Sequence, residues 1–251
     1  MGQGTRIDVA ILPGQRFDPA ASVCVIVDVL RASSSIVTLL DRGCGAVVAA
    51  ADTTEARRLH KSLPDHLLCG EEHGLPPEGF AYGNSPSEFS RLELAGKSVI
   101  LATSNGTRVL AALAAESPAV LVGCLLNRIA VARAAIEIAQ ERRLGITVVC
   151  SAAYGGAVFV LEDALGAGAI ADAALSLDPS LEATDAARFA RDAFSVAATD
   201  ITAAVRSAYH AQELVDTGLG EDVAYCAQLD TSAVAPILQR GEDGVLRLSA
   251  R

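Results

Sequence analysis

Runs of consecutive apolar residues alternate with longer segments of helical periodicity from Ile7 to Cys150, and this alternation constrains the fold more than any other feature of the sequence. A strand that is apolar on successive positions, such as Val23–Val29, is typical of a parallel sheet that is covered on both faces. Parallel strands need a crossover between them, which a helix usually supplies. The sequence therefore predicts an α/β fold: a three-layer α/β/α sandwich with a mostly parallel sheet and a helix-rich C-terminal part.

The predicted elements follow one another up to Cys150. In the last predicted helix, apolar residues recur at helical spacing and form one stripe, and Gly145 is expected to end that helix. Strands are predicted at Ile7–Leu12, Val23–Val29, Gly45–Ala50, His66–Gly70, Lys97–Thr103, Ala119–Cys124 and Ile146–Cys150. Helices are predicted at Ser34–Arg42, Thr53–Lys61, Thr107–Glu116 and Asn127–Arg143.

The texture of the sequence changes after Cys150. From Val158 to Ala227 the chain is rich in alanine and has helical spacing. A short β segment is expected near Val234–Leu238, followed by a polar tail. We expect residues 1–251 to form a single α/β domain, with a helix-rich subdomain at 156–227 as the alternative.

The composition excludes several classes of protein. Of the 251 residues, 51% are hydrophobic and 20% charged, which excludes a disordered chain. The formal net charge is −10. A nucleic-acid partner is not expected, because proteins that bind nucleic acid normally show a basic face to the phosphates.

Cysteine usage and the apolar runs bear on localisation. The six cysteines are scattered without a C-x-x-C pair, so they are expected to be buried thiols of a reducing compartment. No apolar run approaches the ~20 residues that a membrane helix needs, and the first residues do not resemble a secretion signal. We expect a cytoplasmic protein that does not bind membranes; assembly into a homo-oligomer stays open.

The first candidate site is the junction between the strand at Val23–Val29 and the helix that follows it. Asp28 ends the strand, and Arg31 and the hydroxyls of Ser33, Ser34 and Ser35 come next. Ligands of open α/β sheets collect at the carboxyl ends of strands, and free amides at a helix N-terminus bind anions. Arg31 adds a forked cation that suits phosphate or sulfonate. The alternative is that Ser33 or Ser34 caps the helix and Arg31 pairs with a surface carboxylate.

A second strand–turn–helix junction repeats this arrangement. Thr103, Asn105, Gly106 and Thr107 lie between the strand at Lys97–Thr103 and the next helix. Gly106 allows close approach of a ligand to the backbone, and the other three offer hydroxyl and amide contacts. The alternative is an Asn-Gly turn with Thr107 as the N-cap. We expect the two junctions on neighbouring strands, where they would aim two helix N-termini into one crevice, which favours a small substrate with two anionic groups.

The segment Gly70–Phe89 has little periodicity and many turn-forming residues, and we expect an ordered lid or site loop there. Among the histidines only His73, in this segment, is a candidate; His60, His66 and His210 are expected to be structural or exposed. Mg²⁺ prefers hard oxygen ligands. The candidate carboxylates are Asp28, Glu71, Glu72, Glu78, Glu162 and Asp163.

Two apparent motifs fail on their context. Gly96-Lys97-Ser98 precedes a predicted strand, whereas a phosphate-binding P-loop opens a helix. The glycines of Gly166–Ala171 match a dinucleotide fingerprint in letters but lie inside a helical stretch. We expect them to mark tight helix packing.

Six blocks of the sequence occur in a recognisable order. They are DVLRASSSI (Asp28–Ile36), GEEHGLPPEGFAYGNSPSEF (Gly70–Phe89), TSNGTR (Thr103–Arg108), LLNRIAVARA (Leu125–Ala134), LEDALGAGAI (Leu161–Ile170) and the ending Glu221–Pro236. This pattern resembles the 2-phosphosulfolactate phosphatase family over nearly the whole chain. Ser34, Ser35 and Ser104 stand where the family has threonines, which keeps the hydroxyl groups.

The resemblance implies a phosphoric monoester hydrolase that depends on Mg²⁺. Such an enzyme removes phosphate from (R)-2-phospho-3-sulfolactate and leaves sulfolactate, a step towards coenzyme M. This substrate carries a phosphate, a sulfonate and a carboxylate, in agreement with a crevice for two anionic groups.

The hypothesis is metal-assisted hydrolysis with Asp28 and Arg31 as catalytic residues. Asp28 with Glu71 is expected to hold Mg²⁺, and Arg31 with the amides of Ser33–Ser35 to hold the phosphate oxygens. Thr103, Asn105, Gly106 and Thr107 are expected to bind the sulfonate or carboxylate end. A covalent route through Asp28 or a serine stays open. The alternatives are a phosphatase for another small phosphorylated organic acid and a non-catalytic anion sensor.

Overall fold

The strands of the protein form one ten-stranded sheet in the order β4-β5-β3-β10-β9-β6-β2-β7-β1-β8. The computed structural model describes residues 5–12, 14–72, 74–153 and 157–251. Pairings β1–β7, β1–β8, β2–β6, β2–β7, β3–β5 and β4–β5 are parallel, which confirms the predicted mostly parallel sheet. The strands are β1 (Arg6–Ala10), β2 (Ser22–Val27), β3 (Ala46–Ala50), β4 (Leu67–Gly70), β5 (Ser98–Ala102), β6 (Ala119–Gly123), β7 (Gly145–Cys150), β8 (Glu182–Ala183), β9 (Pro236–Arg240) and β10 (Leu246–Ala250).

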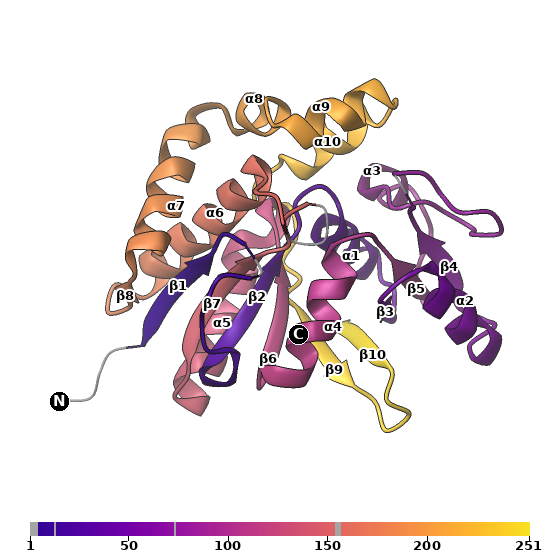
Figure 1. Ribbon diagram of the computed structural model, residues 1–251, viewed down its shortest axis with the longest axis horizontal. Helices are drawn as coiled ribbons and strands as arrows, with labels where there is room; N and C mark the ends of the chain where they lie inside the picture. Colours follow the sequence, from indigo (N-terminus) through magenta and orange to yellow (C-terminus); the bar gives the residue numbers. More distant parts are fainter. Residues whose placement is uncertain (1–4, 13, 73, 154–156) are drawn as a thin grey trace.

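Helices cover both faces of this sheet and complete the three layers (Figure 1). In β2 every residue is buried, and alternate side chains enter different cores: Val25 packs with α5 and α6, whereas Ile26 packs with α1 and α4. The run of consecutive apolar residues therefore belongs to a strand that is covered on both faces, as predicted. The helices are α1 (Ala32–Asp41), α2 (Thr53–Ser62), α3 (Pro86–Phe89), α4 (Gly106–Glu116), α5 (Arg128–Arg142), α6 (Leu161–Leu177), α7 (Asp185–Ala197), α8 (Ile201–Arg206), α9 (Tyr209–Asp216) and α10 (Gly220–Cys226).

The polar tail expected after the last β segment is wrong, because the chain ends in an antiparallel hairpin. Strands β9 and β10 pair with each other and lie in the middle of the sheet, between β3 and β6. They join two parallel blocks that do not touch directly. Leu248 of β10 is fully buried, whereas its neighbours Arg247 and Ser249 are polar and only partly buried. Buried and more exposed side chains therefore alternate along β10, as in a strand with one covered face, although the segment is polar overall.

The end of α5 also differs from the prediction. Arg143, not Gly145, takes the left-handed conformation that closes the helix, with φ of 57°. Gly145 is already the first residue of β7. The helix therefore stops two residues earlier than the glycine suggested.

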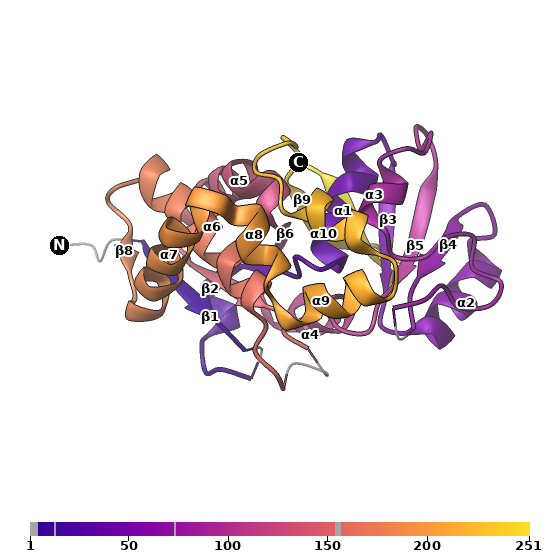
Figure 2. The same ribbon diagram turned by 90° about the horizontal axis from the view of Figure 1, so that it is seen from above.

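Helices α6 to α10 account for the alanine-rich region of the sequence. They share one hydrophobic core with the sheet, in which Leu165 of α6, Leu214 of α9 and Val223 of α10 pack in the same cluster as Val25 of β2. Helices α8, α9 and α10 then pass over the carboxyl ends of the parallel strands, as Figure 2 shows from above.

Two glycines of α6 allow close helix packing, as predicted. A Cβ on Gly166 would lie 2.7 Å from Val29 Cγ2, and one on Gly168 would lie 2.0 Å from the carbonyl oxygen of Ala190 in α7. Both distances are far below normal contact. The glycines therefore fix α6 against the β2–α1 turn and against α7.

The prediction that the cysteines are buried and form no disulfides is confirmed, because all six thiols are buried and free. Over the described ranges, no helix is at once long enough and apolar enough to cross a membrane.

We expect Gly168→Ala to lower the free energy of unfolding by about 1–3 kcal/mol, because the added methyl group overpacks the contact with Ala190. Gly220→Ala is the matched control, since its Cβ would meet only ordinary contacts, from 3.5 Å upward. Urea denaturation of both variants measures the effect. Equal stability of the two variants would contradict the packing argument.

Candidate active site

A pocket of about 940 Å³ lies at the carboxyl ends of the parallel strands, where the chain leaves β2, β4, β5 and β7. Helix α9 supplies the opposite wall. The polar side chains that line it are Asp28, Arg31, Glu71, Glu72, Asn84, Thr103, Ser104, Asn105, Arg108, Glu162, Ser207, Tyr209, His210, Glu213 and Thr217. The apolar ones include Leu30, Val158, Phe159, Val160, Leu161 and Leu214.

The two predicted junctions meet in this pocket, although their strands are not neighbours. Strands β2 and β5 are separated by β6, β9, β10 and β3, so the expectation of adjacent strands is wrong. The chain leaves β5 at its carboxyl end, and α4, which begins after three intervening residues, packs against β2. A Cβ on Gly106 would lie 2.7 Å from Asp28 Oδ2 and 2.7 Å from Ala32 Cβ, so only glycine permits this contact.

The Asp28 carboxylate is buried at the start of α1, with 6% of the residue exposed. Its Oδ1 accepts a hydrogen bond from the Ala32 amide and its Oδ2 accepts one from Ser151 Oγ, both at 2.9 Å. Burial raises the pKa of Asp28; these two bonds and the charge of His210 oppose the increase, and the Glu71 carboxylate adds to it. The Asp28 side chain therefore accepts a hydrogen bond from the first turn of α1. The alternative in the sequence analysis gave this capping role to Ser33 or Ser34.

The three serines lie in α1 and are buried rather than exposed on the pocket wall. Ser33 Oγ accepts from the Asp28 amide, and Ser34 Oγ donates to the Val29 carbonyl at 2.8 Å. The Ser33 amide donates to the Asp28 carbonyl, and the Ser35 amide to the Arg31 carbonyl. These amides are thus engaged within the turn, and the serines shape the backbone that holds Asp28.

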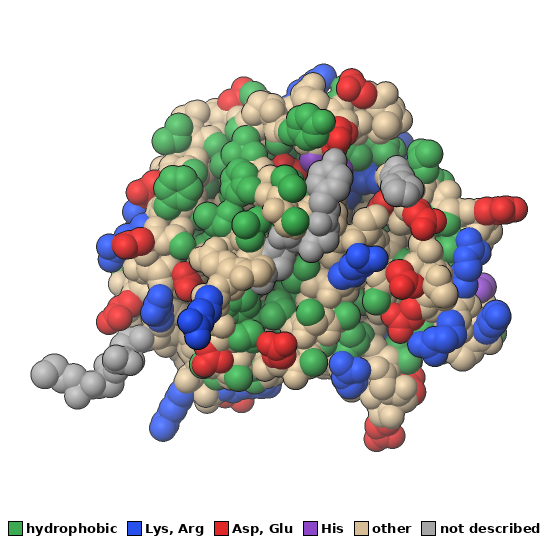
Figure 3. All heavy atoms as spheres, in the orientation of Figure 1, with side chains coloured by type: hydrophobic (Ala, Val, Ile, Leu, Met, Phe, Trp, Pro, Cys, Tyr) green, Lys and Arg blue, Asp and Glu red, His purple; other side chains and the backbone are tan. Residues whose placement is uncertain are grey.

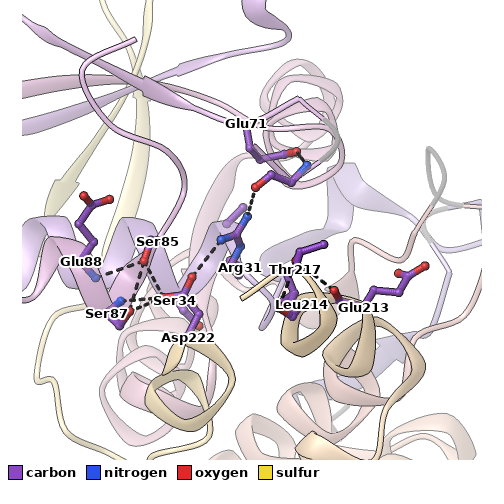
Figure 4. A network of polar contacts seen from close by, with 12 residues as sticks. Arg31, Ser34, Glu71, Ser85, Ser87, Glu88, Glu213, Leu214, Thr217 and Asp222 are labelled. Carbon is purple, nitrogen blue, oxygen red and sulfur yellow. Dashed lines mark hydrogen bonds and ion pairs between the residues drawn. The ribbon is translucent and has the colours of Figure 1, made fainter. Parts of the chain in front are cut away.

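Arg31 is buried and paired, as Figure 4 shows. Its Nη1 donates to Asp222 Oδ2 at 2.9 Å, and its Nη2 donates to the Gly74 carbonyl at 3.2 Å. Asp222 lies on α10, and its Oδ1 accepts from Ser85 Oγ, Ser87 Oγ and the Ser87 amide. The carboxylate expected as the alternative partner exists, but it is buried, not on the surface.

Glu71 connects the irregular segment after β4 to the second junction. Its Oε1 accepts from the Ser104 amide at 2.7 Å and its Oε2 from the Gly74 amide at 2.8 Å. Glu72 also lines the pocket, whereas Glu78 is exposed elsewhere and lies outside the lining. His73 lies outside the described residues.

The second junction is held by two threonines that bond to each other. The Thr107 amide donates to Thr103 Oγ1, and Thr107 Oγ1 donates to the Thr103 carbonyl at 3.0 Å. Asn105, not Thr107, is the N-cap residue. Thr103, Asn105 and Arg108 line the pocket, whereas Gly106 and Thr107 are buried beneath it.

Two carboxyl groups at the start of α6 approach Asp28. Asp163 accepts from the amides of Val29 and Ala152, and burial together with the charges of Asp28 and Glu162 raises its pKa well above the ordinary value. Burial also raises the pKa of Glu162, which is 1% exposed. Within the part of the chain that the structure describes, Glu162 Oε2 has no hydrogen-bond partner.

The charges of the pocket suit a divalent cation together with an anion. The described lining has the carboxylates of Asp28, Glu71, Glu72, Glu162 and Glu213 but only the guanidinium groups of Arg31 and Arg108. No group of three or more His, Cys, Asp or Glu side chains in the described ranges is arranged to hold a metal by itself. Mg²⁺ usually keeps several waters and uses one or two carboxylates plus substrate phosphate, so an oxygen donor set of this kind fits it.

The wall formed by the approach to α6 is apolar. Val158 and Phe159 are 46% and 47% exposed, and Leu161 is 37% exposed. Hydrophobic side chains gather over this region in Figure 3. The pocket therefore has a polar side, built by the two junctions, and an apolar side.

Comparison with known proteins decides the family. The family model described as 2-phosphosulpholactate phosphatase matches residues 12–241. The chain belongs to this family. A protein of Deinococcus radiodurans named probable 2-phosphosulfolactate phosphatase is 37% identical over 98% of this chain and 99% of its own length. Proteins of the same name from Pseudothermotoga lettingae (37% identical, 92% of this chain and 95% of the relative) and Thermotoga maritima (32%, 94% and 96%) are also similar.

Most of the sequence blocks that resemble the 2-phosphosulfolactate phosphatase family come together at the pocket. Four blocks contribute lining residues: Asp28–Ile36, Gly70–Phe89, Thr103–Arg108 and Leu161–Ile170. The block at Glu221–Pro236 supplies Asp222, the partner of Arg31. The block at Leu125–Ala134 serves the fold instead. Its Asn127 accepts from the Cys124 amide and donates to the Val122 and Val234 carbonyls.

The sequence analysis does not identify three residues of this site. Arg108 is exposed and lines the pocket one residue beyond the predicted turn. Asp222 lies in the block Glu221–Pro236, but only the fold reveals that Arg31 is its partner. His210 was expected to be structural or exposed, because no local pattern marks it; helix α9 carries it to the pocket.

We expect Asp222→Ala to lower the free energy of unfolding by about 3–5 kcal/mol, because it leaves the Arg31 charge buried without its carboxylate. Glu221→Ala on the same helix breaks an exposed ion pair with Arg91 and is expected to change stability little. Chemical denaturation of both variants makes the comparison. Similar losses of stability in the two variants would contradict the expectation that the buried Arg31–Asp222 pair matters more for stability than the exposed Arg91–Glu221 pair.

We expect Glu162→Gln to stabilise the protein at pH 8 by on the order of 1 kcal/mol, and by less at pH 5. Because the pKa of Glu162 is raised, the folded state binds its proton more tightly than the unfolded state, and stability falls as pH rises above the ordinary glutamate pKa. Glutamine removes this loss. Denaturation at both pH values, with Glu116→Gln on the surface of α4 as control, gives the measurement; a gain independent of pH would contradict the assignment.

Proposed function

We propose that this protein hydrolyses the phosphate monoester of (R)-2-phospho-3-sulfolactate to sulfolactate and phosphate, with Mg²⁺ as cofactor. The observation that carries the proposal is the meeting of two strand–helix junctions at one pocket, where Gly106 packs against Asp28. The family and the printed names of the relatives support the substrate. The cytoplasm as location and a step towards coenzyme M belong to the same proposal.

Asp28 and Glu71 are the residues that would hold Mg²⁺. Each carboxylate oxygen of both residues accepts one hydrogen bond, which fixes its direction and leaves a second lone pair. When bound there, Mg²⁺ would neutralise charge on the phosphoryl oxygens. Glu72 and Glu162 line the same pocket and would add negative charge around the cation.

Arg31 and the second junction would bind the anionic groups of the substrate. Arg31 is held in a fixed orientation by Asp222, so its remaining donors are preorganised for phosphate oxygens. Thr103, Asn105 and Arg108 would bind the sulfonate or carboxylate end. Gly106 and Thr107 would support these contacts from below, because they fix the turn rather than line the pocket.

Direct attack by water on phosphorus accounts for the chemistry better than a serine nucleophile. Ser33, Ser34 and Ser35 are at most 1% exposed, and the hydroxyls of Ser33 and Ser34 already bond to the backbone. Phosphoryl transfer needs positioning and charge stabilisation more than covalent help. The serines would therefore act by holding Asp28 in place.

A second candidate function is hydrolysis of another phosphorylated organic acid with an apolar substituent. The apolar wall of Val158, Phe159 and Leu161 favours it, because a substrate with three anionic groups gains little from such a surface. A panel of phosphate esters tests both candidates together.

The experiment measures phosphate release from phosphosulfolactate by the full chain, with Mg²⁺ and with EDTA. We expect release with Mg²⁺ and its loss in EDTA. Arg108→Ala should raise KM roughly 10- to 100-fold with a smaller change in kcat, because it removes a charge-assisted contact. Arg133→Ala, an exposed arginine of α5 outside this pocket, is the matched control.

Arg31 is not used for this test, since its loss would leave Asp222 buried and unpaired. Thermal stabilisation by phosphosulfolactate without phosphate release from any ester would favour the anion sensor and contradict an enzyme. Release from esters other than phosphosulfolactate would support the second candidate.

A further inference from the structure

Helix α9 places a histidine and a carboxylate side by side at the pocket. His210 Nδ1 lies 3.1 Å from Glu213 Oε2, one turn along the same helix, and both residues line the pocket. Within the described ranges His210 is the one histidine of this lining; His60 lies on α2 and His66 precedes β4. A ring whose Nδ1 is held by a carboxylate presents its Nε2 to a ligand in a fixed orientation.

His210 faces the acidic end of the pocket. Burial raises the pKa of Asp28, at the end of β2, and of Glu162, at the start of α6, and the charge of His210 opposes both increases. The Glu213 carboxylate adds to the rise in the pKa of Glu162 that burial causes. His210 therefore lines the same pocket as the junction where the phosphate is proposed to bind.

The proposed reaction needs a proton for the oxygen atom of the leaving group. When a phosphate monoester of a secondary alcohol is hydrolysed, the leaving group is an alkoxide. An alkoxide is a strong base and leaves poorly unless an acid protonates it. The arginines of the lining cannot serve, because guanidinium groups do not give up their protons in proteins. An imidazole is the most common general acid in enzymes.

We propose that His210 is the general acid of this phosphatase, which donates the Nε2 proton to the leaving oxygen, and that Glu213 is its positioning residue. The inference rests on the proposed function. The bond between phosphorus and the ester oxygen breaks with its electron pair on that oxygen, which takes the proton from His210 and becomes the alcohol. Water forms the new bond to phosphorus, keeps one proton in the phosphate product, and releases the other to return His210 to its protonated form.

The experiment compares two leaving groups in wild type and His210→Asn. The first substrate is phosphosulfolactate, and the second is p-nitrophenyl phosphate, whose phenolate leaves without protonation. We expect His210→Asn to lower kcat for phosphosulfolactate by about 100-fold or more with little change in KM, and to lower kcat for p-nitrophenyl phosphate by less than tenfold. Glu213→Gln should show the same selectivity with a smaller loss, and His60→Asn should match wild type.

A second measurement keeps the test decisive if the wild type does not turn over the aryl ester. Imidazole added to His210→Ala should then restore part of the kcat for phosphosulfolactate, since the pocket is wide enough to admit it. Unchanged kcat in His210→Asn overturns the proposal, and so does an equal loss on both substrates or no rescue by imidazole. If Glu162→Gln instead shows the selective loss, the acid is Glu162. A wild type that is inactive on every ester refutes the proposed function itself, which is a different outcome.

Discussion

A carboxylate buried at the end of a strand costs free energy unless its oxygens accept hydrogen bonds. Asp28 meets this requirement with the amide of Ala32 and the hydroxyl of Ser151, which come from α1 and from the end of β7. Gly106 then closes the remaining side by bringing α4 into contact with the same carboxylate. Three connections of the sheet are thus fixed around one charged group, and the geometry of the pocket follows from it.

The Arg31–Asp222 pair holds the other half of the site. Asp222 receives Arg31, Ser85 and Ser87, so it joins α1, the segment between β4 and β5, and α10 at one buried point (Figure 4). A buried ion pair of this kind is favourable only if further hydrogen bonds offset the lost hydration, and Asp222 accepts four, three at Oδ1 and one at Oδ2. The residues near the C-terminus are therefore part of the site, although they lie far from it in sequence.

Much of the fold could be read from local patterns, and the exceptions have clear causes. The strand at Val23–Val29 and the helix at Thr53–Lys61 were found because their apolar spacing is local. Strand β10 was missed because a hairpin strand with one buried leucine looks like a polar tail. The position of β2 and β5 relative to each other was wrong, since strand order depends on pairings between distant segments.

The sequence by itself determined the parallel α/β class, the polar turns after β2 and β5, and the family. Each of these depends on residues close together in the chain, whose spacing and hydrogen-bonding groups act locally. Only the tertiary structure decided that the two turns meet, that Arg31 has a buried partner, and that His210 faces the pocket. Those contacts join residues more than a hundred positions apart or cross four strands of the sheet, and no local pattern encodes them.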